Sequence, residues 1–128
     1  MSIGYVTIGA QDVEGAQPFF DATLGALGWK RSNPMEGWAF YGPEGQDAVI
    51  GVCRPYDGAP ARAGNGIMVA FKADTKDQLE AAHAAALANG GSDEGPPGYR
   101  SADEVASGFY AAYFRDPVGN KFCVYLTD

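Results

Sequence analysis

The stretch RDPVGNKFCVY, residues 115–125, predicts a tight turn between two strands. The Asp-Pro pair at 116–117 begins the turn, because the proline ring fixes φ at a value that suits the second turn position. The Gly-Asn pair at 119–120 tolerates the left-handed backbone that ends such a turn. Residues 121–126 are rich in aromatic and β-branched side chains, so they predict a strand that returns beside residues 109–114.

The returning strand contains a cysteine among large apolar residues. Side chains alternate between the two faces of a strand, so Cys123 and Tyr125 share one face while Phe122, Val124 and Leu126 share the other. Whether Cys123 takes part in chemistry depends on what its face of the sheet meets.

The two halves of the chain resemble each other. Setting Tyr5 against Met68 aligns Asp12 with Thr75, and both of these residues are typical helix N-caps. The apolar residues that follow each N-cap recur at helical spacing, and a glycine stands at the end of each expected helix. The same order of elements is therefore expected twice.

Each half predicts a strand, a helix and three more strands. We expect strands at 3–9, 29–32, 38–41 and 48–53 in the first half, and at 67–73, near Tyr99, at 109–114 and at 121–126 in the second. Residues 1–53 and 66–128 are then two βαβββ modules, joined by a linker at 54–65. The fold class is α+β, and the modules form a single domain because neither is large enough to bury its own sheet and helix.

A helix on one side of each sheet leaves the other side uncovered. The covered face is expected to carry Val6, Ile8, Val69, Phe71, Val124 and Leu126. The uncovered face is expected to carry Tyr5, Thr7, Met68, Ala70, Cys123 and Tyr125. These uncovered residues must line a cavity or meet a partner.

The composition excludes several classes of function. A formal net charge of −7 argues against a nucleic-acid partner, whose phosphates require clustered Lys and Arg. No apolar run approaches the roughly 20 residues that span a bilayer, and the N-terminus lacks a secretory signal pattern, so no membrane partner is expected. The two cysteines stand far apart and do not form a disulfide framework. A cytoplasmic protein with reduced thiols is predicted.

Three stretches carry a resemblance to a known family. GYVTIGAQDVEGAQPFFDATLGALGW (4–29), NGIMVAFKAD (65–74) and YAAYFRDPVGNKFCVY (110–125), in paired βαβββ modules, resemble the glyoxalase / bleomycin-resistance / extradiol dioxygenase superfamily, also called the vicinal oxygen chelate superfamily. The resemblance implies that the two modules form a curved, incompletely closed sheet around a cavity, often in a homodimer. Enzymes of this superfamily hold a divalent metal in the cavity on His, Gln or Glu.

The positions that carry those metal ligands hold other residues here. The resemblance places Tyr5, Gly51, Met68 and Cys123 at the four positions, and Val49 or Cys53 are alternatives to Gly51 two residues away. Divalent metals need imidazole or carboxylate donors, with thiolates for zinc. A glycine donates nothing, a thioether is a poor ligand for hard cations, and a phenol must first lose a proton. We therefore expect no metal and no other cofactor.

Cys123 and the single histidine, His83, are the residues that a nucleophilic site would use. A cysteine nucleophile requires a base, but His83 belongs to a helix on the opposite side of the sheet, so a structural thiol in the cavity wall is favoured. Met68 with Cys123, joined by Cys53, is an alternative soft site for Cu(I).

The remaining cavity residues suit a small organic ligand, since aromatic rings and phenolic hydroxyls bind aromatic or cationic molecules. The expected ligand-binding residues are Tyr5, Thr7, Trp38, Gly51, Met68, Tyr99, Arg100, Cys123 and Tyr125. These residues favour a metal-free homodimer that binds a small molecule over an enzyme. One alternative is a lyase, isomerase or dioxygenase-like enzyme with an atypical active site. Another is a dimer whose cavity is filled by its own side chains.

Overall fold

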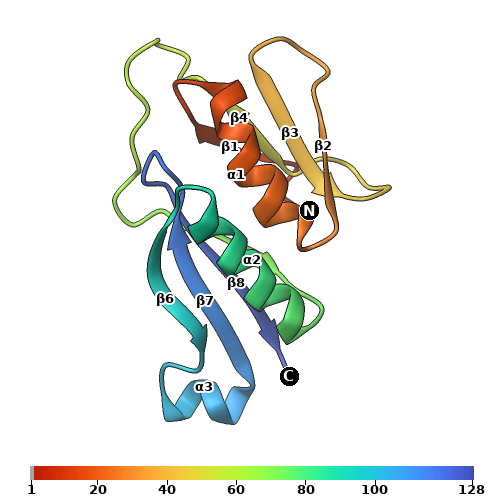
Figure 1. Ribbon diagram of the computed structural model, residues 1–128, viewed down its shortest axis with the longest axis vertical. Helices are drawn as coiled ribbons and strands as arrows, with labels where there is room; N and C mark the ends of the chain where they lie inside the picture. Colours follow the sequence, from red (N-terminus) through yellow and green to blue (C-terminus); the bar gives the residue numbers. More distant parts are fainter. Residues whose placement is uncertain (1) are drawn as a thin grey trace.

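The structure is a computed structural model and describes residues 2–128. Two four-stranded sheets each carry a long helix on one face, and the two helices lie next to each other (Figure 1). The predicted α+β fold with two βαβββ modules is confirmed. The sheets do not close into a barrel, and no hydrogen-bonded ladder joins them among the described residues.

The first module contains β1 to β4 and α1. Its elements are β1 (Val6–Gly9), α1 (Val13–Gly25), β2 (Trp29–Ser32), β3 (Trp38–Pro43) and β4 (Ile50–Cys53). The strand order is β1-β4-β3-β2, with β1 parallel to β4 and the other pairs antiparallel.

The second module repeats this arrangement and adds one helix. Its elements are β5 (Val69–Lys72), α2 (Lys76–Ala88), β6 (Ser92–Gly98), α3 (Ala102–Ser107), β7 (Phe109–Arg115) and β8 (Lys121–Thr127). The strand order β5-β8-β7-β6 matches that of the first module. Both long helices contain 13 residues, as the repeat requires.

The predicted N-caps are confirmed in both modules. Asp12 accepts a hydrogen bond from the backbone N–H of Gly15, and Thr75 accepts one from Gln78. The Gln78 side chain in turn accepts from the backbone N–H of Asp74, which satisfies a further free donor at the start of α2.

The second module differs from the expectation in two details. The strand expected near Tyr99 ends one residue before it and is longer than expected, at Ser92–Gly98, where two prolines weaken the strand pattern at the edge of the sheet. Helix α3 was not expected, although Ser101 caps it, accepting a hydrogen bond from Glu104 N–H, and the left-handed Gly108 ends it. Both cap residues are typical signals, but the helix is only six residues long.

The turn between β7 and β8 ties the two modules together. Asp116 is buried, and its Oδ1 accepts hydrogen bonds from the backbone N–H groups of Val118, Gly119 and Asn120. Gly119 has the expected left-handed backbone at φ 110°. Asn120 does not, since no non-glycine residue among those described has positive φ. The Asn120 side chain instead donates to the carbonyl of Gly9 at the end of β1.

Both modules contribute to one hydrophobic core. Phe19 and Phe20 of α1 meet Phe114 and Phe122 of the second sheet, and the Phe20 and Phe122 rings lie edge to face at 5.8 Å. Because the aromatic packing crosses between the modules, each one buries its apolar face against the other.

No helix in the described part of the chain is long and apolar enough to span a membrane.

Candidate functional site

The uncovered face of the first sheet is an aromatic surface. We call it the first open face and define it by Tyr5, Thr7, Trp38, Phe40 and Gly51. The indole of Trp38 and the ring of Phe40 are stacked, with centroids 5.2 Å apart and an angle of 6° between the planes. Tyr5 meets Phe40 edge to face, and Tyr5 is 55% exposed. The first open face thus presents stacked rings to solvent.

Gly51 lies directly beneath this stack. Gly51 pairs with Phe40 across β3 and β4 and with Thr7 across β1 and β4. A Cβ atom at position 51 would stand 3.1 Å from both the Trp38 and the Phe40 rings, closer than ordinary van der Waals contact. The rings would have to move by a few tenths of an ångström to accept even a Cβ here, so a glutamate at position 51 would disturb the stack.

The uncovered face of the second sheet is more enclosed. We call it the second open face and define it by Met68, Arg100, Tyr113, Cys123 and Tyr125. Cys123 is only 1% exposed, and burial raises the pKa of its thiol to about 11. At neutral pH the thiol is therefore protonated, which makes it a poor nucleophile.

Arg100 covers part of the second open face. Its guanidinium lies 5.0 Å from the centre of the Tyr113 ring and donates hydrogen bonds to the carbonyls of Pro96, Gly98 and Ala111. These three carbonyls hold the segment between β6 and α3 against the sheet. The chain thereby fills part of this face with its own side chain, as one alternative from the sequence anticipated.

Tyr99 lies apart from Arg100, although the two are adjacent in sequence. The Tyr99 ring meets Tyr110 edge to face at 5.2 Å, and its hydroxyl contacts Lys76 and Asp128. Tyr110 belongs to the helix-covered face of the sheet, since it pairs with the core residue Leu126. Tyr99 and Arg100 therefore do not line one surface.

The other expected site residues fall into two groups. Tyr5, Thr7, Trp38 and Gly51 share the first open face, and Met68, Arg100, Cys123 and Tyr125 share the second. Met68 is 43% exposed beside β5, and Tyr125 stacks on Phe109 at 5.3 Å.

The donor set does not fit the divalent metal of the superfamily enzymes. Gly51 has no donor, Met68 offers a thioether, Tyr5 offers a phenol that must first lose a proton, and the single thiol of Cys123 does not complete a site. No group of three or more His, Cys, Asp and Glu side chains that could hold a metal occurs within residues 2–128. The three sulfur residues are also divided, with Cys53 in the first sheet and Cys123 in the second.

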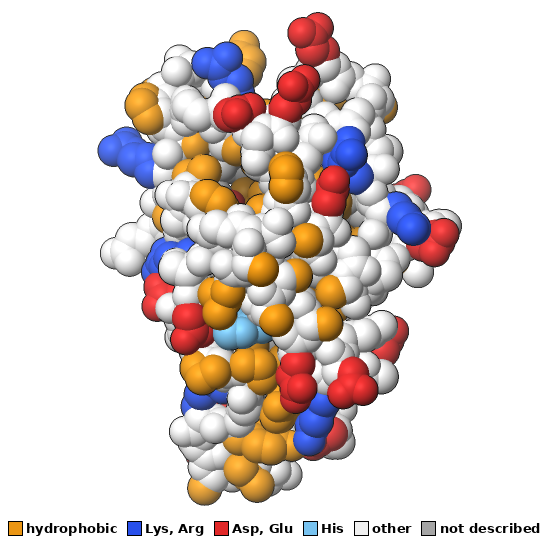
Figure 2. Space-filling model, in the orientation of Figure 1, with side chains coloured by type: hydrophobic (Ala, Val, Ile, Leu, Met, Phe, Trp, Pro, Cys, Tyr) orange, Lys and Arg blue, Asp and Glu red, His pale blue; other side chains and the backbone are white. Residues whose placement is uncertain are grey.

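His83 has a structural place. It is 6% exposed, and its Nε2 lies 2.9 Å from Oδ1 of Asp93 on β6. Figure 2 shows this imidazole as a small patch bordered by hydrophobic and acidic side chains. Asp93 lies on the helix-covered face of the sheet, so His83 cannot act as a base for Cys123.

Two adjoining cavities lie where the modules meet. One, of about 370 Å³, is bounded by β1, β5 and the linker, and the other, of about 400 Å³, lies between the linker and the β7–β8 turn. They share Ala63, Gly64, Ile67, Met68 and Lys121, and we call them together the intersheet cavity. Thr7 lines it from the first open face and Met68 from the second.

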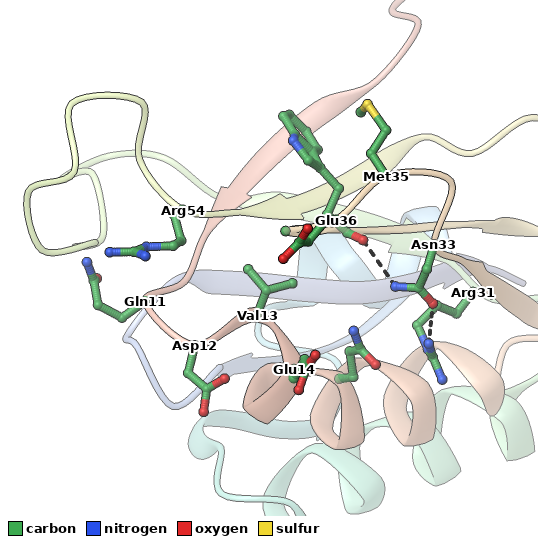
Figure 3. Close-up of a pocket in the computed structure, with 12 residues that line it drawn as sticks. Gln11, Asp12, Val13, Glu14, Arg31, Asn33, Met35, Glu36 and Arg54 are labelled. Atoms are coloured by element: carbon green, nitrogen blue, oxygen red, sulfur yellow. Dashed lines mark hydrogen bonds between the residues drawn. The ribbon is translucent and has the colours of Figure 1, made fainter.

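The structure also contains a third cavity, of about 590 Å³, which the sequence does not predict. It lies between the start of α1, the β2–β3 hairpin and Arg54 (Figure 3). Its walls carry both cations and carboxylates: Asp12, Glu14, Arg31, Glu36 and Arg54. These residues come from separate elements, and no pattern in the sequence indicates that they converge.

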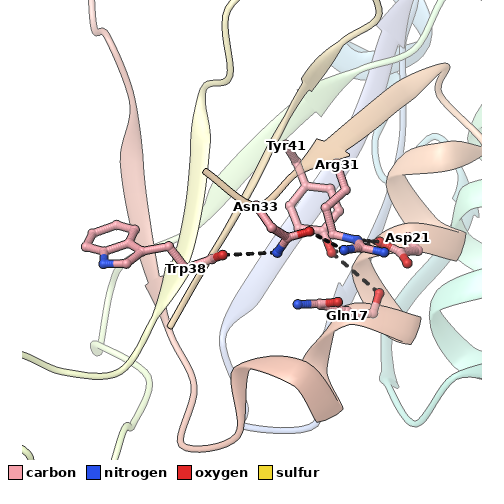
Figure 4. Close-up of polar contacts among 6 residues, drawn as sticks. All are labelled: Gln17, Asp21, Arg31, Asn33, Trp38 and Tyr41. Carbon is pink, nitrogen blue, oxygen red and sulfur yellow. Dashed lines mark hydrogen bonds and ion pairs between the residues drawn. The ribbon is translucent and has the colours of Figure 1, made fainter. Parts of the chain in front are cut away.

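The cation nearest to α1 in this third cavity is already paired. Arg31 Nε lies 2.9 Å from Asp21 Oδ1, and the Tyr41 hydroxyl donates to the same oxygen (Figure 4). Burial and the neighbouring carboxylate raise the pKa of Tyr41 well above its ordinary value. Arg31 and Tyr41 thus fasten α1 to the sheet, so we assign these two residues a structural role.

The fold defines a class of protein with paired βαβββ modules, each sheet of which has one face that is not covered by a long helix. A family model described as Glyoxalase/Bleomycin resistance protein/Dioxygenase superfamily matches residues 2–124, and the chain belongs to this superfamily. The comparison with curated proteins gave no match.

Solved structures support the same assignment. A glyoxalase/bleomycin resistance protein from Albidiferax ferrireducens T118 is 37% identical, with a TM-score of 0.84 over 98% of both chains. A superfamily enzyme from Burkholderia phytofirmans PsJN has 17% identity and a TM-score of 0.74 over 100% of both chains. A lactoylglutathione lyase from Agrobacterium tumefaciens has 21% identity and a TM-score of 0.65 over 98% of this chain and 92% of that chain. The last two show the fold alone.

Proposed function

We propose that this protein is a homodimer that binds a small organic molecule without a divalent metal. The observation that carries the proposal is the Trp38–Phe40 stack over Gly51. The stack lies against the Cβ position of residue 51, and Gly51 itself supplies no metal donor. The same rings offer a flat apolar surface for a ligand.

Exposed apolar side chains support the homodimer. Tyr5 and Met68 stand on the two open faces, and Ile67 adjoins Met68, yet all three are exposed in the single chain. A neighbouring apolar set of this kind is typical of an interaction surface. A second copy that covered the open faces would enclose the ligand between the two chains. Localisation in the cytoplasm stays a prediction from the sequence.

Metal content tests the first part of the proposal. The purified protein is analysed by mass spectrometry before and after incubation with Fe, Ni, Zn, Mn or Cu(I), followed by dialysis. We expect no stoichiometric divalent metal. A stoichiometric hard divalent ion would overturn the proposal in favour of an atypical enzyme, and copper alone would direct attention to Met68 and Cys123.

Tryptophan fluorescence tests ligand binding. The chain has two tryptophans, of which Trp38 lies on the open face and Trp29 packs against Phe71 in the core. Binding of the uncharged aromatic probe N-phenyl-1-naphthylamine should quench Trp38 by energy transfer. The Trp29→Phe variant should keep saturable quenching, and the matched Trp38→Phe variant should lose most of it. The proposed function would be contradicted if neither this probe nor its anionic analogue, 8-anilinonaphthalene-1-sulfonate, bound saturably.

A further inference from the structure

The charged residues that line the intersheet cavity are all cationic. They are Arg62, Arg115 and Lys121, and no Asp or Glu side chain lines either part of it. This is unexpected in a chain with 16 acidic and 9 basic residues. The third cavity has the opposite character, since three carboxylates stand beside its two arginines. The intersheet cavity is therefore lined by basic residues alone among its charged residues, whereas the third cavity is lined by residues of both signs.

Lys121 is central to this arrangement because it lines both parts of the cavity. It lies at the start of β8 and is half-buried, with its ammonium 6.0 Å from the centre of the Tyr113 ring. No carboxylate within residues 2–128 lies within ion-pair distance of Lys121. The cation thus has an aromatic neighbour but no ion-pair partner, although Glu94 lies close enough for Lys121 to help lower its pKa.

The other two cations differ in how far they are neutralised. Arg115 is paired with Glu94 on β6 and donates to the carbonyl of Gly119. Arg62, in the linker, forms no ion pair with any described residue. Lys121 and Arg62 are therefore available to bind an anion, whereas the charge of Arg115 is already neutralised by Glu94.

The remaining wall of the cavity is apolar. Val6 and Ile8 of β1 line it together with Met68, Val69 and Ile67. A ligand that matches both parts of the wall has an apolar body and a negatively charged group. A charge-assisted hydrogen bond to an ammonium or guanidinium is stronger than a neutral one, so the charged group would determine the orientation.

We propose that the intersheet cavity binds a small organic anion, with its carboxylate, sulfonate or phosphate at Lys121 and Arg62 and its apolar part against Met68. This inference rests on the proposed function and specifies the charge of the ligand. It replaces the aromatic or cationic ligand that the aromatic side chains suggested with an anionic one.

Two probes that differ only by a charged group test the inference. They are 8-anilinonaphthalene-1-sulfonate and its uncharged parent, N-phenyl-1-naphthylamine, titrated into wild type, Lys121→Met and Lys30→Met. Lys30 is an exposed lysine of β2 that lines neither part of the cavity and pairs with none of the residues that define the open faces, so its variant is a matched control. We expect Lys121→Met to weaken sulfonate binding about tenfold and to change binding of the uncharged parent by less than about twofold. Lys30→Met should bind both probes as wild type does.

Methyl NMR locates the bound sulfonate. With ¹³C-methyl methionine, the Met68 signal should shift on titration, whereas that of Met35, which lines the third cavity, should not. The melting temperature of each variant verifies that it is folded, and Lys121→Glu provides a second variant that should bind the sulfonate still more weakly.

The outcomes separate the inference from the proposed function. If the uncharged probe binds but the sulfonate binds no better and is insensitive to Lys121, the anion site is wrong and the proposed function survives. If the sulfonate shifts Met35 instead of Met68, the location is wrong. If neither probe binds wild type, the proposed function itself fails.

Discussion

Gly51 stands at the middle of the first open face, and its missing side chain is what allows Trp38 and Phe40 to stack there. The rings rest on the bare backbone of β4, so the residue that removes a metal donor also makes an aromatic surface possible. Cys123 has the complementary position in the second sheet, where burial keeps its thiol protonated. The glycine at position 51 and the buried thiol at position 123 both favour packing and binding over metal chemistry.

A glutamate at position 51 tests this view directly. We expect Gly51→Glu to lower the free energy of unfolding by about 1–3 kcal/mol, because the new side chain must displace one or both rings. The measurement is denaturant unfolding, with near-UV circular dichroism to follow the Trp38 environment. The matched control is Gly4→Glu, which makes the same charge change where no atom lies within 4 Å of a new Cβ. Equal stability of the two variants would contradict the steric argument.

Strand β6 shows how an element with weak strand propensity is held in place. Its sequence SDEGPPG contains two prolines and two glycines, and its pairing with β7 is irregular. Polar contacts support it, since Asp93 bonds His83 of α2 and Glu94 pairs with Arg115 of β7. The hydrogen bond from Gly95 N–H, followed by that to His83, lowers the pKa of Asp93 below its ordinary value.

The Asp93 contacts predict a pH dependence of stability. Because folding lowers the Asp93 pKa, its contribution is present above the ordinary value of 3.8 and is lost as pH falls through the lower folded value. Asp93→Asn should therefore be less stable than wild type at pH 7, and the difference should shrink as pH falls below that ordinary value. The measurement is urea unfolding at pH 7 and at a pH below 3.8.

The exposed loop residue Asp47 supplies the control for this prediction. Asp47→Asn is expected to match wild type at both pH values. A deficit of Asp93→Asn that persists unchanged in acid would show that the carboxylate charge is not responsible.

At the scale of the whole molecule, two modules share one core and leave one face of each sheet uncovered. Phe20 of the first module packs on Phe122 of the second, and Asn120 bonds the end of β1. The modules are thereby held at the angle that creates the intersheet cavity. The open faces and this cavity adjoin at Thr7 and Met68, so ligand binding and association of two chains are expected to use neighbouring surfaces.

Oligomeric state tests the role of the open faces. Tyr5→Arg places a charge on the first open face and should shift the protein from dimer to monomer in size-exclusion chromatography with light scattering. Tyr56→Arg makes the same change at a fully exposed linker residue and should stay dimeric. A monomeric wild type would contradict the proposed homodimer, and a dimeric Tyr5→Arg variant would show that the first open face is not the interface.

Much of the fold was predictable because its signals are local in sequence. The N-caps Asp12 and Thr75 begin the two long helices where expected, and the alternation of side chains in β8 placed Phe122, Val124 and Leu126 in the core. Helix α3 was missed because a helix of six residues has too few turns for apolar periodicity to appear.

The candidate site was only partly predictable. Trp38 and Gly51 were both expected at the cavity, but their contact depends on the register between β3 and β4, which neither strand specifies alone. Tyr99 and Arg100 were expected together, yet the backbone at the start of α3 turns their side chains to different surfaces.

The amino-acid sequence alone was sufficient for the two-module α+β fold and for the superfamily, since local patterns and the resemblance of three stretches carry that information, and the absence of the usual metal ligands stays a prediction from the sequence. The enclosure of Cys123, the stack over Gly51 and the basic intersheet cavity could be recognised only in the tertiary structure. Each of them depends on side chains from distant segments that meet only once the sheets and helices have packed. Lys121 and Arg62 stand 59 positions apart in the chain and carry no shared pattern, yet both line one cavity in the folded protein.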